Sequence, residues 1–592
     1  MMNDSPQQFY KSQIKAHQVT LDSFKSKLVL YSIARVIVYL AGVMGVYIYF
    51  HQFHIMIPIA LIAVVGFFVL LTRHTNLKAK RNLYKALLDI NIEELKISKG
   101  TFLDRYDGRL FQDPKHAFCF DIDLFGKGSF FQYIDRTAVD AGTETLANVL
   151  KANDTNNIEA RQEAIKELAA LPEWRQLYTA KASLIKTETP ANLIIDWLKG
   201  YQSFMPKAMQ WVPKVFGLLS VAVIALGALQ IIGVSFIAYW LFVGLIITAI
   251  YLKKINEIAM YTSKVKDTFR QYAQLLDLIE TSDFKSQLLQ AKQKEIQSNQ
   301  VKASQIFKEL SKALDALDNR NNMLSIFFGN GFVLWDIMQS YKIEQWIVKY
   351  GTVVEGWFDV VTFFDAYNSL GNFVFNHPEY VYPEINLDSN VLIDAKNLGH
   401  PLLDPDKRVT SDLHIDNEAF FIVTGANMAG KSTFLRTVSL HIMMANVGLP
   451  VCASSSLYRP IKLITSMRTS DSLAEDSSYF FSELTRLKYI VDQVKETPYF
   501  IILDEILKGT NSTDKAIGSR KFVEKLVAGN ATGIIATHDL SLCEIEADLN
   551  AVTNYFFDAN IINDELCFDY KLKKGVCQNM NASFLLKKMD IV

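Results

Sequence analysis

The chain has 592 residues, enough for about three or four folding units. Its 61 Lys and Arg residues nearly balance 62 Asp and Glu residues, so the net charge of −1 gives no global basic excess of the kind typical of nucleic-acid-binding proteins. The five cysteines are scattered without a C-x-x-C pair, which argues against a zinc site or a disulfide framework and favours reduced thiols.

Long apolar runs stand in the first half of the chain. Leu28 to Phe50 contains Arg35 as its one charged residue, and neither Ile55 to Thr72 nor Val215 to Leu252 contains any. As one helix the last run would be about 57 Å long, far beyond the hydrocarbon core of a bilayer, so we expect a turn at Gly233. We therefore predict two transmembrane hairpins, with buried helices of a soluble bundle as the alternative.

Basic residues flank both hairpins on one side, and the short turns between the spans carry none. They are Lys25, Lys27, Arg73, Lys78, Lys80 and Arg81 at the first hairpin and Lys207, Lys214, Lys253 and Lys254 at the second. The positive-inside rule then predicts a cell (inner or plasma) membrane protein with about four spans and a cytosolic remainder. Because the spans are otherwise free of ionisable residues, we expect anchors rather than a transport path.

The segments around the second hairpin have helical patterns. Asp121 to Leu150 and Ile158 to Leu168 are expected to be amphipathic helices, and Trp346 to Phe375 one apolar helix. Ile255 to Asn321 lacks Pro and Gly, which predicts long helices, and its mixed charges favour a solvated face over a nucleic-acid surface. His377 to Pro383 is a Pro-containing linker into the last domain.

A phosphate-loop pattern follows the apolar run that begins at Phe420. Gly425 to Ser432 reads G-x-x-x-x-G-K-S, and a helical pattern comes next, which is the strand, loop and helix order of such sites. The glycines let backbone N–H groups surround phosphate oxygens, and the helix N-terminus adds its positive end. The predicted nucleotide-binding residues are Gly425, Ala426, Asn427, Met428, Ala429, Gly430, Lys431, Ser432 and Thr433. The alternative is a Gly-rich turn that binds nothing.

Two further apolar runs end in polar residues. Tyr499 to Glu505 predicts a buried strand with Asp504 at its carboxyl end, and Thr532 to Thr537 predicts another that ends at His538. We expect ATP and Mg²⁺ as cofactors, with the metal held by Ser432 and Asp504. The expected catalytic residues are Lys431 on the outer phosphates, Glu505 polarising the attacking water and His538 sensing the terminal phosphate.

These motifs together resemble the MutS family of DNA mismatch-repair ATPases. Thr424 to Arg436, T-G-A-N-M-A-G-K-S-T-F-L-R, is similar to the family's Walker A segment, and Asn427 and Met428 are not part of the generic pattern. Leu503 to Asp514 and Ala536 to Leu540 resemble two further family motifs. The resemblance also covers Thr465 to Leu473, Ser478 to Leu484 and Gly399 to Leu403.

The resemblance implies an ABC-related ATPase domain that works as a homodimer. Ser478 matches a serine that reaches the partner's nucleotide, and Ser512 to Asp514 match a loop at the same interface. Asp476 stands where the family usually has a glycine, which departs from the expected composite site. As an alternative, Ser478 is the N-cap of the helix that follows it.

The predicted fold is multidomain, with α-helical membrane hairpins, a helical lever region and a C-terminal α/β P-loop ATPase domain. The expected units are a tail at 1–27, a hairpin at 28–72, a MutS-core-like helical segment at 73–214, a hairpin at 215–252, a lever- or clamp-like region at 253–383 and the ATPase domain at 384–592. No segment resembles the family's N-terminal mismatch-reading domain.

We therefore expect a membrane-anchored ATPase in which ATP binding and hydrolysis switch a homodimer in contact with membrane lipids. Two outputs remain open. In the first, the helical arms bind mismatched or branched DNA in repair, which the family implies and the net charge does not support. In the second, the protein is an ATP-driven scaffold or mechanotransducer with a protein partner and no DNA.

Overall fold

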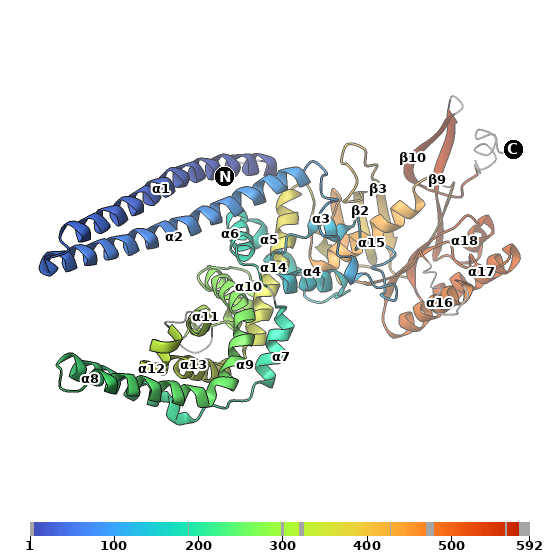
Figure 1. The fold of residues 1–592 in the computed structure, drawn as a ribbon. Helices are drawn as coiled ribbons and strands as arrows, with labels where there is room; N and C mark the ends of the chain where they lie inside the picture. Colours follow the sequence, from blue (N-terminus) through green and yellow to red (C-terminus); the bar gives the residue numbers. More distant parts are fainter. Residues whose placement is uncertain are drawn as a thin grey trace.

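The computed structural model describes residues 5–187, 189–297, 301–318, 325–426, 428–468, 479–562 and 565–578. Two long helical hairpins project from a helical body, and an α/β domain occupies the C-terminal third of the chain (Figure 1). This combination of a mostly helical part with a C-terminal α/β region agrees with the fold expected from the sequence.

The first hairpin consists of α1 (Pro6–Ile48) and α2 (Phe53–Ile97). Small residues let the two helices approach closely, since a Cβ at Gly42 would lie 2.6 Å from the Ala63 methyl group. The outer faces are apolar and open, with Ile62 72% exposed. Of the residues expected as a tail, 6–27 form the first part of α1, and the expected boundary at residue 72 falls inside α2.

The second hairpin consists of α8 (Val212–Ala228) and α9 (Val234–Glu280). The Phe216 and Trp240 rings stack between them, with centroids 4.8 Å apart, and the Trp240 indole N–H donates to Ser220 Oγ at 2.7 Å. α9 has 47 residues, so it continues from the apolar run through the expected boundary at residue 252 and ends inside the helical body. One rigid element therefore belongs to both the hairpin and the body.

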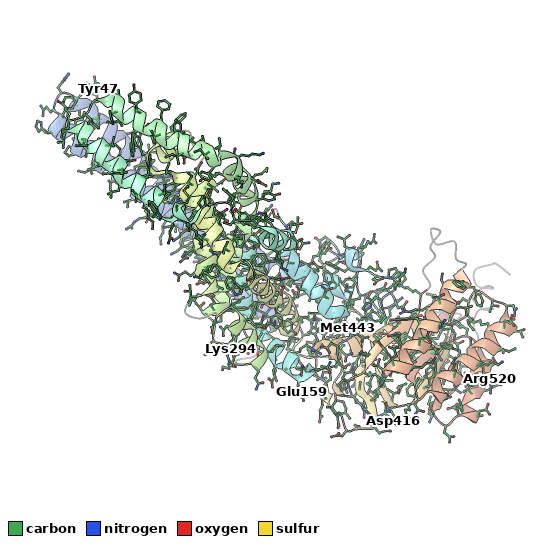
Figure 2. The ribbon with its side chains drawn as sticks, turned by 90° about the horizontal axis from the view of Figure 1, so that it is seen from below. Tyr47, Glu159, Lys294, Asp416, Met443 and Arg520 are labelled. Atoms are coloured by element: carbon green, nitrogen blue, oxygen red, sulfur yellow. The ribbon has the colours of Figure 1, made fainter. Side chains whose placement is uncertain are left out.

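Three helices among the described residues are long and apolar enough to cross a membrane, namely α1, α2 and α9, whereas α8 is shorter. The most apolar stretches of the three helices are only 6%, 0% and 11% buried. Both hairpins point away from the α/β domain (Figure 1), and Figure 2 places Tyr47, near the tip of α1, at the opposite end of the molecule from Arg520. Membrane crossing by about four spans remains a prediction.

The helical body surrounds the buried helix α14 (Val354–Asn376). Its other helices are α3 (Phe130–Ile134), α4 (Asp140–Lys151), α5 (Ile158–Ala169), α6 (Pro172–Ser183), α7 (Ala191–Gly200), α10 (Gln287–Glu295), α11 (Ala303–Asp318), α12 (Asn330–Val333) and α13 (Trp335–Tyr350), with short turns η1 (Arg109–Phe111), η2 (Lys207–Gln210) and η4 (Ser325–Gly329). The tertiary core is continuous from this body into the α/β domain.

The extents predicted for two helices are wrong. The single helix from Trp346 to Phe375 is interrupted, because α13 ends at Tyr350 and α14 begins at Val354. The segment from Asp121 to Leu150 holds α3 and α4 separated by extended backbone. Glycines with positive φ make the turns before α3, and Ser129 then caps that helix by accepting a hydrogen bond from the Gln132 N–H at 3.1 Å.

The described residues of the α/β domain form two sheets. The smaller has the order β1 (Glu384–Ile385), β5 (Ser455–Tyr458), β2 (Val391–Leu398), β3 (Ser411–Asp416). The larger has the order β10 (Glu565–Lys574), β9 (Val552–Ile562), β4 (Phe420–Gly425), β8 (Thr532–Ala536), β7 (Tyr499–Asp504), β6 (Lys462–Ser466). Its strands are parallel except for the β9–β10 pair. The helices are α15 (Lys431–Val447), α16 (Tyr479–Glu496), α17 (Ser512–Ala528) and α18 (Ile545–Asp548), with η5 (Leu540–Glu544) before α18.

Candidate nucleotide-binding site

The phosphate loop lies between the central strand β4 and the start of α15. Gly425 has a φ of 148° and Gly430 a φ of 104°, and both values favour glycine. A Cβ at Gly425 would also lie 2.7 Å from the Phe557 carbonyl oxygen, which leaves no room for a side chain. The loop conformation therefore depends on the two glycines of the sequence pattern.

Polar groups from neighbouring strands meet at this loop. The sheet register pairs Asp504 on β7 with Ala536 on β8, so both strands end at the same edge. The Ser432 hydroxyl donates a hydrogen bond to Asp504 Oδ2 at 2.7 Å. The Glu505 N–H donates to the Ala536 carbonyl oxygen at 2.9 Å, which holds Glu505 beside β8 with a φ of 51°. The structure thus brings the predicted metal ligands and the predicted base together.

Lys431, Glu505 and His538 form one polar cluster. Lys431 Nζ donates to the carbonyl oxygens of Gly425 at 2.8 Å and Ala426 at 3.0 Å. The His538 Nε2 atom lies 3.2 Å from Lys431 Nζ and 2.9 Å from Glu505 Oε1. One ring nitrogen cannot donate to the carboxylate and accept from the ammonium at once, so a proton on Nε2 favours Glu505 and its loss favours Lys431.

Electrostatics keep the candidate base ionised. The hydrogen bond with His538, ahead of the nearby Lys508 charge, lowers the pKa of Glu505 to about 2 despite partial burial. Burial lowers the pKa of Lys431 and raises the pKa of Asp504. Both of these shifts reflect charges that have lost solvent, and phosphate oxygens beside Lys431 or a cation beside Asp504 would offset them.

Ser432 and Asp504 fit a magnesium ion, because they place two oxygen ligands side by side. Within the described residues, no group of three or more His, Cys, Asp or Glu side chains could hold a metal ion by itself. Mg²⁺ at this position would therefore also take phosphate oxygens and water as ligands, which is its usual coordination in nucleotide sites.

A cavity of about 450 Å³ opens beside the loop. Its loop side includes Met428 and Thr433, and its other walls supply residues that sequence reasoning missed: Leu398, His400, Leu403, Val409, Phe557 and Tyr570. These mostly apolar and aromatic groups suit a nucleobase. Tyr570 lies at an irregularity of β10, and its ring would meet a Cβ at Gly430 at 3.2 Å.

The additional residues differ in whether a sequence feature could have identified them. His400 belongs to the G-H-P-L-L segment, so the family resemblance around Gly399 could have indicated it, and burial lowers its pKa to about 4. No sequence pattern marks Tyr570, because its place depends on how β10 folds back over the loop.

Two predicted site residues, Asn427 and Ser478, lie outside the described residues, as does Asp476. The Ala429 N–H donates to the Ala426 carbonyl oxygen at 3.3 Å and closes the loop. Ser512 to Asp514, the expected interface loop, form the exposed start of α17, which is capped by the Asn511 side chain accepting from the Asp514 N–H at 2.8 Å.

The helical body is attached directly to the α/β domain. Arg161 on α5 donates to the Asn446 carbonyl oxygen near the end of α15 at 2.6 Å. Asn153 forms two hydrogen bonds with the backbone of Leu463 on β6, at 2.9 Å and 2.8 Å. Since α15 begins at Lys431, one helix contacts the phosphate loop at one end and the helical body at the other.

Comparison with known proteins identifies the α/β domain. Residues 421–587 match the family model of MutS domain V. MutS protein homolog 4 of Homo sapiens is 33% identical over 215 residues, which cover 34% of this chain and 22% of the relative. DNA mismatch repair protein MutS of Lachnoclostridium phytofermentans is 32% identical over 221 residues, or 36% of this chain and 23% of the relative. The corresponding protein of Methanococcoides burtonii is 33% identical over 221 residues, again 36% of this chain and 24% of the relative. The matches thus span less than a quarter of these relatives.

Proposed function

We propose, from the premise that this chain belongs to the MutS family through its nucleotide-binding domain, that it is a membrane-anchored ATPase whose nucleotide state controls the helical arms. The observation that carries the proposal is the single helix α9. Its distal part is apolar and open, with Phe236 62% and Ile250 73% exposed, and its proximal part is buried in the body that contacts α15. A lipid environment would cover the distal part.

ATP hydrolysis would use the polar cluster of the loop. Lys431 would exchange its two carbonyl contacts for the outer phosphates, which also offsets the burial of its charge. Glu505, kept ionised by His538, would orient and polarise the attacking water. Mg²⁺ bound by Ser432 and Asp504 would neutralise developing charge on the phosphates.

Rigid contacts would transmit the movement caused by ATP binding from the α/β domain to the hairpins. A dimer closing over ATP, with Ser512 to Asp514 and the expected Ser478 at its interface, would move α15 relative to the sheet. Arg161 ties the far end of α15 to α5, which packs on α14. Because α2 and α9 run without a break into the hairpins, any tilt of the body would reach the membrane.

The catalytic part is tested by Glu505→Gln in purified full-length protein. The substitution keeps the size of the side chain and removes the carboxylate, so ATP turnover should fall roughly 100-fold or more while ATP still binds. Glu496→Gln, at the end of α16 and outside the cavity, is the matched control. Unaltered turnover in Glu505→Gln would contradict the assigned role.

DNA binding is a second candidate function, and one groove between α9 and α11 favours it. Arg270, Lys302, Lys308 and Lys312 line a groove of about 550 Å³ together with Asp277 and Glu309. The uncharged distal part of α9 weighs against DNA at the hairpin tip, because phosphate binding requires Lys or Arg.

A salt series with mismatched, branched and paired duplexes separates the two outputs. Phosphate contacts predict an affinity that falls steeply with salt and weakens when Lys308 and Lys312 become alanine. Absence of binding at low salt, with ATP turnover intact, would favour a scaffold or mechanotransducer that acts on a protein partner.

A further inference from the structure

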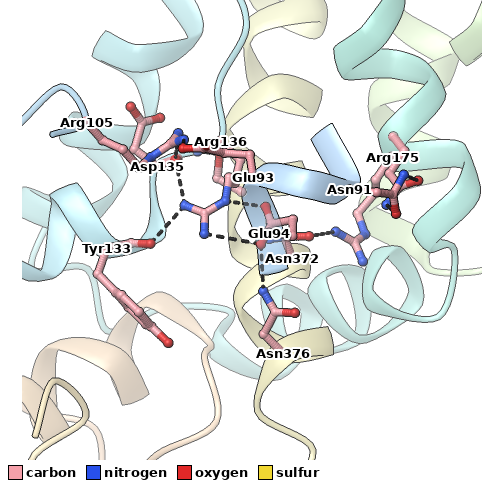
Figure 3. A network of polar contacts seen from close by, with 12 residues as sticks. Asn91, Glu93, Glu94, Arg105, Tyr133, Asp135, Arg136, Arg175, Asn372 and Asn376 are labelled. Atoms are coloured by element: carbon pink, nitrogen blue, oxygen red, sulfur yellow. Dashed lines mark hydrogen bonds and ion pairs between the residues drawn. The ribbon is translucent and has the colours of Figure 1, made fainter. Parts of the chain in front are cut away.

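A second cavity, of about 690 Å³, lies in the helical body between α2, α6 and α14 and shares no lining residue with the nucleotide site. Figure 3 shows the polar network at its wall, which joins residues from these helices and from the loops before α4. Its volume falls within the roughly 300–1,000 Å³ of typical small-molecule sites and far exceeds the roughly 30 Å³ of one water molecule.

Basic side chains outnumber acidic side chains in the lining of this cavity. Among the residues that the structure describes, four basic side chains line it against three acidic ones: Lys85, Arg105, Arg136 and Arg175 against Asp89, Glu93 and Glu94. Glu94 is already used, because it forms an ion pair with Arg136 and accepts hydrogen bonds from Asn372 and Asn376, each at 3.1 Å (Figure 3). Glu93 is paired with Arg105 at 3.2 Å.

Arg175 is a buried cation, and this network does not satisfy all of its hydrogen-bond donors. The side chain is 3% exposed, and it donates to the Leu168 carbonyl oxygen at 2.8 Å and to Asn372 Oδ1 at 2.7 Å. Its Nη2 atom has no hydrogen-bond partner among the residues that the structure describes. Burial lowers the pKa of Arg175 to about 10, as expected for a guanidinium without its own carboxylate.

Two other cavity residues have the same deficit within the described part of the chain. Asn368, 2% exposed on α14, has both side-chain amide atoms buried without a partner. The Nε atom of Arg105 is likewise buried and unpaired. Three of these four unpaired atoms are donors, and Asn368 Oδ1 is an acceptor. Native interiors rarely leave several polar groups unsatisfied around one space, so the excess of donors favours an acceptor-rich group as the occupant.

We propose that this cavity binds a small soluble oxyanion, a metabolite bearing phosphate or carboxylate groups, held by Arg175, Arg105 and Lys85. A soluble ligand fits better than a lipid headgroup. On α2 the cavity begins at Asn82, ten residues and about 15 Å beyond the end of the apolar run at Thr72. Headgroups extend only about 5–8 Å beyond the hydrocarbon core.

The position of the site gives the ligand a structural effect. α2 continues into the first hairpin, and α14 leads into the nucleotide-binding domain. An oxyanion that contacts both helices and α6 would hold hairpin and body in one arrangement, and it would stabilise the folded protein in proportion to its saturation.

The experiment is thermal unfolding of the full-length protein in neutral-lipid nanodiscs, titrated with inorganic phosphate or with citrate against chloride of equal ionic strength. A saturable rise in Tm with at least one probe is expected, and no rise beyond chloride with either probe would overturn the proposal. The rise should persist in Lys431→Ala, because the phosphate loop is a separate anion site; its loss there would assign the effect to that loop and overturn the proposal.

Two charge reversals on one helix locate the site. Lys85→Glu, at the exposed rim of the cavity, should weaken binding about fivefold or more, whereas Lys80→Glu, exposed on α2 and outside the cavity, should leave it unchanged. Equal affinities in the two variants would refute the placement. Arg175→Met should abolish binding, and Lys85→Glu decides the matter if that variant does not fold.

Nanodiscs with anionic lipid separate the two sources of an oxyanion. Binding of the soluble probe should be the same in neutral and anionic discs. Loss of the Tm rise in anionic discs, with the rise kept in neutral discs, would mean that a headgroup occupies the cavity and would overturn the assignment to a soluble ligand.

Discussion

Glu344 provides the sharpest test of how the second hairpin is attached. This carboxylate on α13 is fully buried and accepts four hydrogen bonds from the segment that leads to α8. The donors are the Tyr201 hydroxyl at 2.9 Å, the Ser203 hydroxyl at 2.9 Å, the Phe204 N–H at 2.9 Å and the Met205 N–H at 3.0 Å. Each carboxylate oxygen accepts two of them, so both oxygens are needed.

The substitution Glu344→Gln replaces one of these oxygens by an NH₂ group. The Phe204 or Met205 N–H then faces a donor and loses its partner, which costs about 1–3 kcal/mol, and the remaining bonds lose their ionic character. Relief from burying a charge offsets part of this loss. We expect a net destabilisation of about 2 kcal/mol, and about 4 kcal/mol for Glu344→Ala, which leaves all four donors unpaired.

Hydrogen exchange and limited proteolysis of residues 201–211 in the detergent-solubilised protein measure this effect locally. The segment should open more often in Glu344→Gln than in the wild type, while the α/β domain keeps its protection. Glu309→Gln, on the exposed face of α11, is the control and should change neither the hydrogen exchange nor the proteolysis of this segment. Unchanged protection in Glu344→Ala would show that the four hydrogen bonds to Glu344 do not hold this segment in place.

Three other substitutions test the site and the core. Gly425→Ala should abolish nucleotide binding measured by equilibrium titration, because its φ of 148° and the 2.7 Å approach to the Phe557 carbonyl exclude a methyl group; wild-type affinity would contradict the loop geometry. Tyr570→Ala should lower ATP affinity several-fold, about 1 kcal/mol, with phosphate-loop contacts intact; unchanged affinity would exclude the aromatic contact. Burial raises the pKa of Asp365 to about 8, so the folded state holds its proton more tightly than the unfolded state and stability should fall as pH rises from about 4 to 8. Thermal unfolding of Asp365→Asn across this range should show a flatter profile, and an identical slope would refute the assignment.

The geometry of the candidate nucleotide site could be predicted largely from the sequence, because the signals that specify it are local. The run from Phe420 to Ser432 specifies a buried strand, a glycine loop and a helix start within one short segment. Asp504 and His538 were placed from the general rule that ligands gather at the carboxyl ends of parallel strands, and the register of β7 with β8 agrees with it. The assigned chemical roles of these residues remain predictions.

Other features depend on contacts between distant segments. The network in Figure 3 joins residues from three different elements, namely Glu94, Arg136 and Asn372. No spacing in the sequence therefore predicts it. The break between Tyr350 and Val354 interrupts a run whose apolar pattern continues through it. The continuity of α9 was missed for a related reason, since a change from apolar to charged composition indicates a change of surroundings and says nothing about where a helix ends.

ATP hydrolysis in membranes floated from lysate after a high-salt wash measures whether the ATPase is anchored by its hairpins. Salt-resistant turnover should float with the lipid and should fall roughly 100-fold or more with Glu505→Gln. Protein and turnover that remain in the soluble fraction, or floated turnover equal in the two proteins, would contradict the proposal of a membrane-anchored ATPase.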